Sequence, residues 1–458
     1  MQALIELPEA HSKKQQLIMN CSMIPGLEEL WVSCGTKFGK TLSGTGSYCS
    51  LFPRLNSGII RHIAPIYSQS VIGMRYAQKM LPGKPHTESR MSGKPTITWK
   101  DRRKESIIEY WHGQDPEALE GEGTMFNLLD EASKMKRQVY ASTVTTVTRT
   151  RGLIVPMSTP RGKNWFYNGC MQAKAEMEWC LKKGINPTKI FITAPTSANK
   201  FIDKQVIENN KRNLPDRLFR QYFEAEFVDD GEVFPFFKDA IFGPPLLFEF
   251  DSQVWFMEKA EDMDRIVIGA DWGQQNDFSV FTAWSAQSRM MVGFMRFRGI
   301  DYISAIKNLV WFSGNFADVI DVKHDKTGLG NVMDDHLAYT DLRYEGVTFT
   351  NKNKSAMVNS LMLAFQRHDI KIPNWPKMIE ELDSFEVQTN EIGTMKYNAS
   401  KGMHDDIVCS MLWGWFAVEE YAPSQMEVVT LDELAAMDFD RKDFGPATED
   451  FEKWKAIN

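Results

Sequence analysis

The sequence has few cysteines and no arrangement in which they could act together. The six cysteines among 458 residues are scattered and include no CxxC pair, which argues against a zinc site or a disulfide framework and suits a reducing compartment. The sequence also lacks an uninterrupted apolar run of about 18 residues, the length that a membrane-spanning helix needs. We therefore expect no membrane span.

An excess of positive charge is also absent. The net charge is −7, so any contact with nucleic acid has to come from local basic patches. The amino-terminal stretch MQALIELPEAHSKKQQLIM has acidic and polar residues where a secretory signal has an apolar core, so no signal peptide is expected. With 43% hydrophobic and 25% charged residues, the composition is typical of a globular protein, and the length favours two domains plus a short tail.

Two different rhythms along the chain predict two domains. From Leu30 to about Val228, short apolar runs alternate with segments of helical pattern, as in an α/β layer structure. The stretch Gly231–Pro245 is rich in glycine, proline and aromatic residues and interrupts this rhythm, so we expect the connection at about 230–262. The predicted division is a first domain at 1–235, a second at 236–425 and an acidic tail at 426–458.

The second domain has the element order of an RNase H-like fold. Its apolar runs predict strands at 265–271, 278–284 and 290–297, a helix at 302–312, a strand at 319–322 and further alternation up to a closing helix that starts at Asp405. The helical period places six apolar residues of that closing helix on one face: Ile407, Val408, Met411, Leu412, Trp415 and Phe416.

The first chemical motif follows the apolar run at 30–32 and reads SCGTKFGKT. A strand that leads through a glycine-containing loop into a helix directs backbone N–H groups at phosphate oxygens. Lys40 would neutralise the outer phosphates of a nucleotide, and Thr41 would hold Mg²⁺. The match is imperfect because the first glycine stands at Gly35, one place after the position occupied by Cys34. Seven residues form the predicted phosphate loop: Gly35, Thr36, Lys37, Phe38, Gly39, Lys40 and Thr41.

Two further strand ends complete a predicted site for nucleotide hydrolysis. The run MFNLLDEAS ends an apolar strand at Asp130 and Glu131, where one carboxylate can join the Mg²⁺ shell and the next can polarise the attacking water. Singly, such acids are also common as solvated strand ends. The run GLIVPMSTP ends another strand at Ser158 and Thr159, hydroxyls that would lie near the γ-phosphate and couple to hydrolysis.

Acidic residues also end two strands of the second domain and open its closing helix. Asp271 follows one strand, Asp325 follows another, and Asp405 and Asp406 stand at the start of the helix. Each has an ordinary explanation as a turn acid or a helix cap. In an RNase H-like layout, however, these three places meet at one end of the sheet, where clustered carboxylates would repel one another unless two divalent cations bridged them.

Basic residues form several small groups, at 100–104 and at three lysine pairs. They could be solvated surface, or they could follow a DNA backbone without reading its sequence. The pairs are Lys323 with Lys326, Lys352 with Lys354, and Lys396 with Lys401.

These motifs together resemble the large terminase subunit of tailed bacteriophages over about residues 1–425. The resemblance rests on GTKFGKT, LLDEAS, VPMSTPRGKNWFY and FRQYFEAEFVDDGEVF in the first domain, and on GADWG, DFSV, HDKTGLG and GMHDDIVCS in the second. It implies an N-terminal P-loop ATPase domain with a parallel-type sheet and a C-terminal RNase H-like nuclease domain. Gln15 or Gln16 would form the adenine-reading Q motif.

The resemblance also assigns the metal ligands of the second domain and reveals two departures from the family. Metal binding falls to Asp271, Asp325 and Asp405, with Asp406 as a fourth ligand. The family usually has an arginine in the phosphate loop where this chain has Thr36, and many members have another shortly before the strand that ends at Asp130. Four arginines are candidates for the missing arginine finger: Arg102, Arg103, Arg149 and Arg151.

The resemblance implies a viral genome-packaging motor, which hydrolyses ATP to translocate double-stranded DNA into a procapsid and cleaves concatemeric DNA with a two-metal-ion endonuclease. The cofactors would be ATP with Mg²⁺ in the first domain and two Mg²⁺ or Mn²⁺ in the second. The expected partners are double-stranded DNA, the portal protein and procapsid, the small terminase subunit and a ring of its own copies on the portal, the free chain being a monomer. It would work in the host cell cytoplasm, transiently at the procapsid vertex, and be absent from the mature virion.

Two other functions remain open at this point. A helicase-like ATPase fused to a repair nuclease predicts helicase motifs after Pro160, and we identify none there. A nucleotide-gated assembly clamp would use the ATPase motifs and keep the acids only for structure. DNA-stimulated phosphate release would separate the clamp from the two enzymes.

Overall fold

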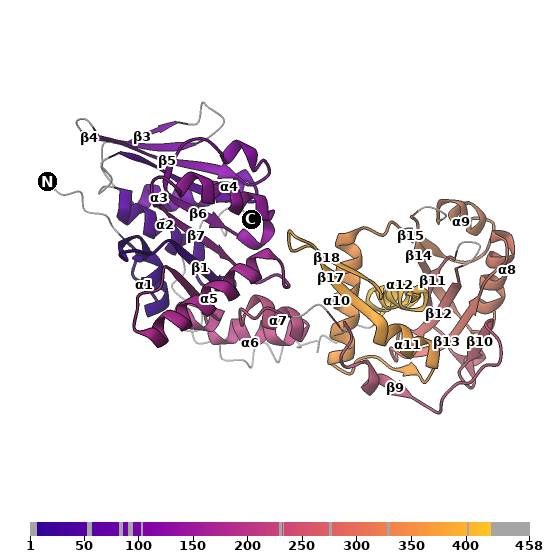
Figure 1. Ribbon diagram of the computed structural model, residues 1–458. Helices are drawn as coiled ribbons and strands as arrows, with labels where there is room; N and C mark the ends of the chain where they lie inside the picture. Colours follow the sequence, from indigo (N-terminus) through magenta and orange to yellow (C-terminus); the bar gives the residue numbers. More distant parts are fainter. Residues whose placement is uncertain are drawn as a thin grey trace, which may run out of the picture.

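The computed structural model has two lobes, each built around its own β-sheet (Figure 1). It describes residues 7–52, 57–81, 86–89, 95–101, 104–228, 231, 233–273, 277–327, 330–400 and 403–422. The predicted tail, 426–458, lies outside these ranges. In the described part of the chain, no helix combines the length and the apolarity that a bilayer crossing requires.

The first lobe contains an eight-stranded, mostly parallel sheet in the order β3-β4-β5-β2-β6-β7-β1-β8. Neighbours from β5 to β8 in this order are parallel, whereas β3, β4 and β5 form antiparallel pairs. Its central strands are continuous apolar runs because helices cover both faces. The strands are β1 (Glu29–Cys34), β2 (Gly58–Ala64), β3 (His86–Ser89), β4 (Thr96–Asp101), β5 (Lys104–His112), β6 (Thr124–Asp130), β7 (Leu153–Ser158) and β8 (Lys189–Ala194).

Helices pack on both faces of this sheet. α2 (Lys40–Leu51) and α3 (Tyr67–Met80) cover one face, and α4 (Arg137–Val147) and α5 (Trp165–Lys183) cover the other. α1 (Lys13–Met19) packs on α2. Short 3₁₀ helices occur at Cys21–Met23, Glu117–Leu119, Ala132–Lys134 and Thr196–Ala198.

A connecting region follows β8. It contains α6 (Lys204–Asn213) and α7 (Asp216–Tyr222), then a 3₁₀ helix at Phe237–Ala240 and the two-residue strand β9 (Ile241–Phe242). Another 3₁₀ helix at Ala260–Asp262 precedes the second sheet.

The second lobe contains a six-stranded sheet in the order β10-β13-β12-β11-β14-β15. Each neighbouring pair from β10 through β13 and β12 to β11 is antiparallel, whereas β14 is parallel to β11 and β15 is parallel to β14. This is the predicted RNase H-like arrangement. The predicted α/β fold of both halves is therefore confirmed. The strands are β10 (Gln253–Phe256), β11 (Ile266–Asp271), β12 (Ser279–Ser285), β13 (Met291–Phe297), β14 (Val319–Asp325) and β15 (Tyr344–Val347).

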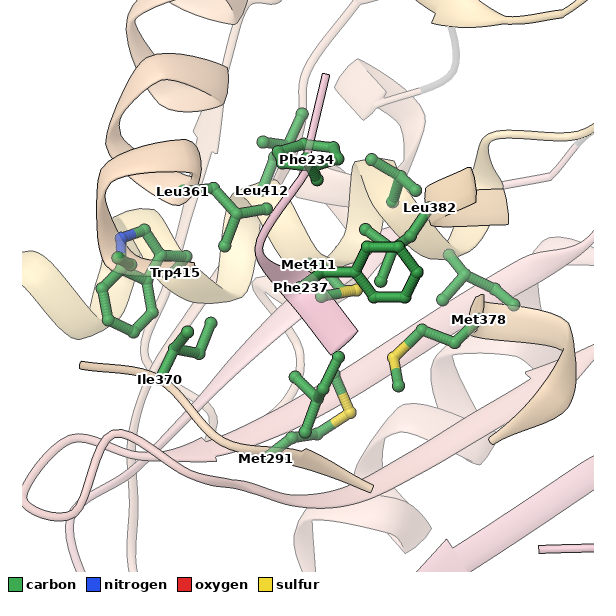
Figure 2. Close-up of a cluster of buried hydrophobic side chains, with 14 of the residues drawn as sticks. Phe234, Phe237, Met291, Leu361, Ile370, Met378, Leu382, Met411, Leu412 and Trp415 are labelled. Carbon is green, nitrogen blue, oxygen red and sulfur yellow. The ribbon is translucent and has the colours of Figure 1, made fainter. Parts of the chain in front are cut away.

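Helices cover both faces of the second sheet as well. α8 (Tyr302–Ser313) and α9 (Gly330–Leu337) pack on one face, and α10 (Asn351–Gln366), α11 (Pro376–Ser384) and α12 (Asp406–Tyr421) form the other side. β16 (Ile372–Pro373) pairs with β9, and β17 (Phe385–Thr389) with β18 (Met395–Ala399) forms a hairpin between α11 and α12. The side chains of Phe234 and Phe237 join this core, as Figure 2 shows.

The closing helix α12 differs from the one-faced helix expected from its sequence. Every residue from Ile407 to Val418 is buried except Phe416, which is half-buried. The helix lies between the sheet on one side and α10 and α11 on the other. An amphipathic pattern was a wrong prediction, because a helix in the middle of a three-layer structure needs apolar or small residues all round.

Among the described residues, hydrogen bonds link the second lobe to the first lobe at one place and to the connecting region at another. The hairpin of β17 and β18 points toward the first lobe (Figure 1), and at its turn Glu391 accepts hydrogen bonds from the Arg137 backbone N–H (3.0 Å) and the Asn164 side chain (3.3 Å). At the second place, the Gln366 side chain accepts from the Asp216 backbone N–H at 2.8 Å.

Candidate nucleotide and metal sites

The phosphate loop leaves β1 at Cys34 and enters α2 at Lys40. Cys34 is a buried residue of β1, so the loop begins one place later, and it is there that a residue without a side chain is needed. A Cβ atom added at Gly35 would lie 2.5 Å from Thr196 Oγ1 and 2.7 Å from the Phe223 carbonyl oxygen, contacts that backbone and packed side chains do not tolerate. The shifted glycine of the motif therefore matches the point where the loop passes closest to its neighbours.

The segment after β8 holds this loop in place. The Thr36 N–H donates to the Tyr222 carbonyl oxygen at 2.7 Å, and the Thr196 hydroxyl donates to the Thr36 carbonyl oxygen at 2.8 Å. The Asn199 side chain donates to the Lys37 carbonyl oxygen at 2.8 Å. The loop conformation is thus fixed from outside, by residues that the sequence motif does not contain.

The Lys40 ammonium group is buried at the mouth of the loop. It donates to the carbonyl oxygens of Cys34 and Gly35, each at 3.0 Å, and to Thr159 Oγ1 at 2.9 Å. Burial lowers the pKa of Lys40, and the negative charge of Glu131 opposes that shift. One of the two predicted coupling residues, Thr159, therefore contacts the predicted phosphate-binding lysine directly.

Thr41 and Asp130 form a pair of oxygen ligands. The Thr41 hydroxyl donates to Asp130 Oδ2 at 2.7 Å, and His62 Nε2 lies 3.7 Å from the same oxygen. Burial raises the pKa of Asp130, but the hydrogen bonds and charges of His62, Thr41 and Lys40 outweigh it and lower the pKa overall. The buried Oδ1 of Asp130 has no hydrogen-bond partner in the described structure. Hard oxygen donors with one oxygen left free fit Mg²⁺.

Glu131 and the two coupling residues lie next to this pair. Glu131 has a left-handed backbone, with φ of 57°, which is uncommon for a residue other than glycine and recurs at functional sites. Its carboxylate forms an ion pair with Lys134 at 2.9 Å. Ser133 Oγ lies 2.7 Å from Ser158 Oγ and donates to the Thr159 carbonyl oxygen at 3.1 Å. Ser133, two residues after Glu131, thus links the segment that carries the predicted hydrolytic residue to both coupling residues.

Of the two candidate glutamines, Gln15 lies at the phosphate loop and Gln16 is exposed. Gln15 Oε1 accepts from the His11 N–H at 2.8 Å, and its Nε2 would lie 2.7 Å from a Cβ placed at Gly39. His11 Nε2 lies 2.6 Å from the Phe38 carbonyl oxygen. The sequence did not predict a role for His11, since a histidine before a short helix has no recognisable spacing to the loop.

In the second lobe, strand pairing brings two of the predicted acids together. β11 and β14 are parallel neighbours with Ala270 opposite His324, so Asp271 and Asp325 end adjacent strands at one edge of the sheet. The helix α12 then lies unusually close to β11. A Cβ at Gly269 would be 2.1 Å from the Ser410 carbonyl oxygen and 2.2 Å from the Gly414 nitrogen. This close approach carries Asp405 and Asp406 to the same edge.

The charges of these four aspartates act on one another. Burial raises the pKa of Asp271 well above its ordinary value, and Asp406, Asp405 and Asp325 raise it further, in that order. Burial also raises the pKa of Asp406 to about 6, with His404 opposing and Asp405 adding to the shift. The His404 ring lies 3.5 Å from Asp406 Oδ2. Buried carboxylates of like charge are the donor set that divalent cations neutralise, so these residues fit a metal site.

Asp405 occupies the N-cap position of α12, but its side chain makes no capping hydrogen bond. Its Oδ2 instead lies 3.5 Å from the Lys354 ammonium group, which extends from α10. Burial alone would lower the pKa of Lys354, but Cys409, Asp405 and Asp271 outweigh it and raise the pKa. The ordinary explanation of Asp405 as a helix cap is therefore wrong, and Lys354, one of the lysines expected to be solvated surface or a DNA contact, lies beside this candidate metal ligand.

The other lysines predicted as a possible DNA track behave differently. Lys323 is buried and pairs with Asp321 (3.0 Å), Glu420 (2.8 Å) and Glu345. Lys326 pairs with Asp334 at 2.7 Å. Asp321, Glu345 and Glu420 around Lys323 are the only acidic, histidine or cysteine side chains in the described structure that offer three ligand atoms within 4.8 Å of one another. The Lys323 ammonium group already contacts all three carboxylates and offsets part of their charge. Both lysines have a structural explanation.

Two of the four candidate arginines are described. Arg149 lies beside Gly123, and Arg151 stands two residues before the start of β7, at the same end of the sheet. β6 runs from there to Asp130, a length of roughly 20 Å. Neither arginine is therefore near Lys40 of its own chain, and Arg102 and Arg103 lie outside the described residues.

No protein-family model matches the chain. Over 309 residues it is 26% identical to the large terminase subunits of Thermus virus P23-45 and of Thermus phage G20c, and each alignment covers 65% of this chain. Its curated relatives are large terminase subunits. The resemblance that the motifs carry is thereby confirmed, although the chain spans only 62% of the length of these relatives.

Solved large terminase structures share the fold of both lobes. The large terminase of a thermophilic bacteriophage superposes with a TM-score of 0.52 at 13% identity, covering 90% of this chain and 99% of its own. A structure of that large terminase in complex with ADP gives a TM-score of 0.50 at 14% identity and covers 88% and 98% of the two chains. At these identities the similarity concerns the fold, which is that of a large terminase along most of the chain.

Proposed function

We propose that this chain is a viral genome-packaging motor subunit, which hydrolyses ATP to translocate double-stranded DNA into a procapsid and cleaves concatemeric DNA with a two-metal-ion endonuclease. One observation carries the proposal. A single chain whose relatives are large terminase subunits combines a buried Lys40 beside the Thr41–Asp130 pair with an edge of four interacting aspartates in its second lobe. The division into domains at 1–235 and 236–425 belongs to the proposal, and the packing of Val233 and Phe234 in the second core favours a junction a few residues earlier.

In the first site, the phosphate loop from Gly35 to Thr41 would bind ATP. Lys40 would exchange its carbonyl contacts for phosphate oxygens, and Gln15 would read the adenine. When bound between Thr41 and Asp130, Mg²⁺ would neutralise charge that develops on the phosphates. Glu131 would orient the attacking water, and Ser158 and Thr159 would register the loss of the γ-phosphate through their hydrogen bonds. The ADP complex of the similar large terminase supports a nucleotide as a ligand of the proposed motor.

In the second site, Asp271, Asp325, Asp405 and Asp406 would hold two Mg²⁺ or Mn²⁺. Bound at this edge, the cations would supply activation of water and stabilisation of the leaving oxygen in phosphodiester cleavage. Lys354 would screen the carboxylates and contact a phosphate of the DNA. Its contribution is charge without base recognition, in agreement with cleavage that is not specific to sequence.

The partners and location follow from packaging. A translocating motor has to keep hold of duplex DNA while one subunit resets, so we propose a ring of copies on the portal of the procapsid, formed from a monomeric free chain. The small terminase subunit would select viral DNA. The chain would act in the host cytoplasm at the procapsid vertex and be absent from the mature virion.

Separation of the two activities tests the proposal. Lys40→Ala should abolish ATP turnover and leave metal-dependent cleavage of plasmid DNA intact, whereas Asp271→Ala should abolish cleavage and leave ATP turnover intact, because the sites lie in different lobes. ATP turnover by the wild type should rise when procapsids carrying the portal are added. Strand separation by the wild type, together with no response to procapsids, would instead favour a helicase-like ATPase fused to a repair nuclease.

A further inference from the structure

The amino end of α12 is capped by another helix. The first N–H groups of a helix have no partner within it and are usually satisfied by the side chain at the N-cap. In α12 the N-cap Asp405 makes no such bond. The N–H groups of Ile407 and Val408 donate instead to Glu381 Oε2, at 2.8 and 3.4 Å. Because Glu381 belongs to α11, the cap comes from outside the helix, and the Asp405 carboxylate faces Lys354 without a capping role.

Apolar contacts keep Glu381 in this position. Met378 and Leu382 of α11 lie in the same core as Met411 and Leu412 of α12, as Figure 2 shows. Residues three and four apart share one face of a helix, so Glu381 lies on the face of α11 that packs against α12. Its side chain is buried, with 5% of the residue exposed.

A carboxyl group is a costly choice for this place if packing were its only purpose. Burial of an ionisable group is unfavourable unless its polar atoms find partners, and Asp406 adds an acidic group nearby. An apolar residue of similar size would fill the same space. Such a residue could not, however, accept hydrogen bonds from the backbone N–H groups of Ile407 and Val408, which directly follow Asp406.

We propose that Glu381 is a positioning residue for the metal site, and that its carboxyl group fixes the first turn of α12 and thereby the places of Asp405 and Asp406. The inference rests on the proposed function of these aspartates as metal ligands. It assigns to Glu381 the capping role that the sequence pattern gives to Asp405. Partners that orient metal ligands without touching the metal commonly affect affinity by about 10–100-fold.

Three substitutions separate acceptance of hydrogen bonds from packing. Glu381→Gln keeps an oxygen acceptor at the same distance from the backbone, and Glu381→Met keeps the unbranched shape without the acceptor. Glu380→Ala is the matched control, because Glu380 is the neighbouring exposed residue on α11 and pairs only with Lys377 at 3.0 Å among its described ion pairs. Thermal unfolding and amide exchange at Ile407 and Val408 verify that each variant folds and show whether the first turn has loosened.

The measurement is a titration of the full chain with Mn²⁺ alone, with Asp271→Asn giving the signal that does not come from this site. Glu381→Met should weaken Mn²⁺ binding by about 10–100-fold, while Glu381→Gln and Glu380→Ala stay within about twofold of the wild type. Plasmid cleavage should follow the same split, with a higher half-saturating Mn²⁺ concentration for Glu381→Met and a maximal rate close to that of the wild type.

Two results would overturn the inference. One is a Glu381→Met variant that binds Mn²⁺ as tightly as the wild type, and the other is a Glu381→Gln variant as weak as Glu381→Met. A wild type that binds Mn²⁺ but does not cut DNA would refute the nuclease and leave the titration to decide on Glu381. A wild type that gives no Mn²⁺ signal above Asp271→Asn would refute the metal site and the positioning role together.

Discussion

Replacement of Asp406 by asparagine should stabilise the protein when no divalent metal is present. Asp406 is the first residue of α12, and its side chain is only 15% exposed. Burial raises its pKa to about 6, His404 opposes the shift, and Asp405 adds to it. Its buried Oδ2 has no hydrogen-bond partner in the described structure. Asparagine has nearly the same shape and no charge, so the substitution removes the electrostatic cost alone.

The expected gain in stability follows from the pKa shift of Asp406. A pKa that rises from about 4 to about 6 on folding corresponds to about 3 kcal/mol of stability. Because the folded pKa is the higher one, the folded state holds this proton more tightly. The penalty is therefore absent below about pH 4, grows through the interval up to about pH 6 and is complete above it. Loss of a favourable acid at the helix amino end costs about 0.3–1 kcal/mol in return, which leaves a net gain of roughly 2 kcal/mol near pH 8.

The assay is thermal unfolding in the presence of a chelator, measured by calorimetry. For a lobe of 150–250 residues, a gain of 2 kcal/mol corresponds to an increase of roughly 4–8 °C in Tm. We expect that increase for Asp406→Asn at pH 8 and little change at pH 4. Asp335→Asn, an exposed acid on α9 of the same lobe, should change Tm little at either pH. A Tm for Asp406→Asn at or below that of the wild type at pH 8 would refute the electrostatic reasoning.

Two further substitutions test the geometry of each site. Glu131→Gln should keep nucleotide binding and lose hydrolysis, since it removes only the group that orients water, and nucleotide fluorescence with a phosphate-release assay would measure both; normal release would contradict the role. Gly269→Ala should push α12 away from β11, because the added Cβ would lie 2.1 Å from the Ser410 carbonyl oxygen. Overpacking of this kind costs about 1–3 kcal/mol, so denaturant unfolding should show a loss of that size together with weaker metal-dependent cleavage, and an unchanged midpoint would show that the helix can move without cost.

The sequence predicted the residues that end strands and missed those that reach the sites from elsewhere. Asp271 and Asp325 could be found because apolar runs ending in an acid mark strand ends, and neighbouring parallel strands bring such ends together. Glu381 and His11 could not, since a single glutamate on a helix or a single histidine before one has no local pattern that distinguishes a site residue from a surface residue, and the pair Lys352 and Lys354 could be read equally as surface or as a DNA contact. Their contacts arise only from the packing of distant segments.

The closing helix shows the same limit in its packing. The apolar residues of α12 predicted its start at Asp405 and one apolar face, but not that Ser410 and Gly414 on its other side would be buried as well. In the folded chain these small residues face the sheet. Ser410 Oγ donates to the Gly269 carbonyl oxygen at 2.9 Å and lies 3.0 Å from the Thr282 hydroxyl. Small residues that permit a close approach read as solvent-exposed in a sequence, so the tight contact between α12 and β11 was not predictable.

The electrostatics of the second site is itself an argument for its proposed function. The close approach at Gly269 and the cap supplied by Glu381 bring four carboxylates to one sheet edge, where Asp406 alone costs about 3 kcal/mol in its charged form. Lys354 offsets only part of this repulsion. A fold needs no such arrangement for its own stability, because apolar residues at the same places would be more stable. Several groups with strongly shifted pKa values at one place are characteristic of functional sites. Divalent cations are the ligands that would replace the repulsion between these carboxylates by attraction.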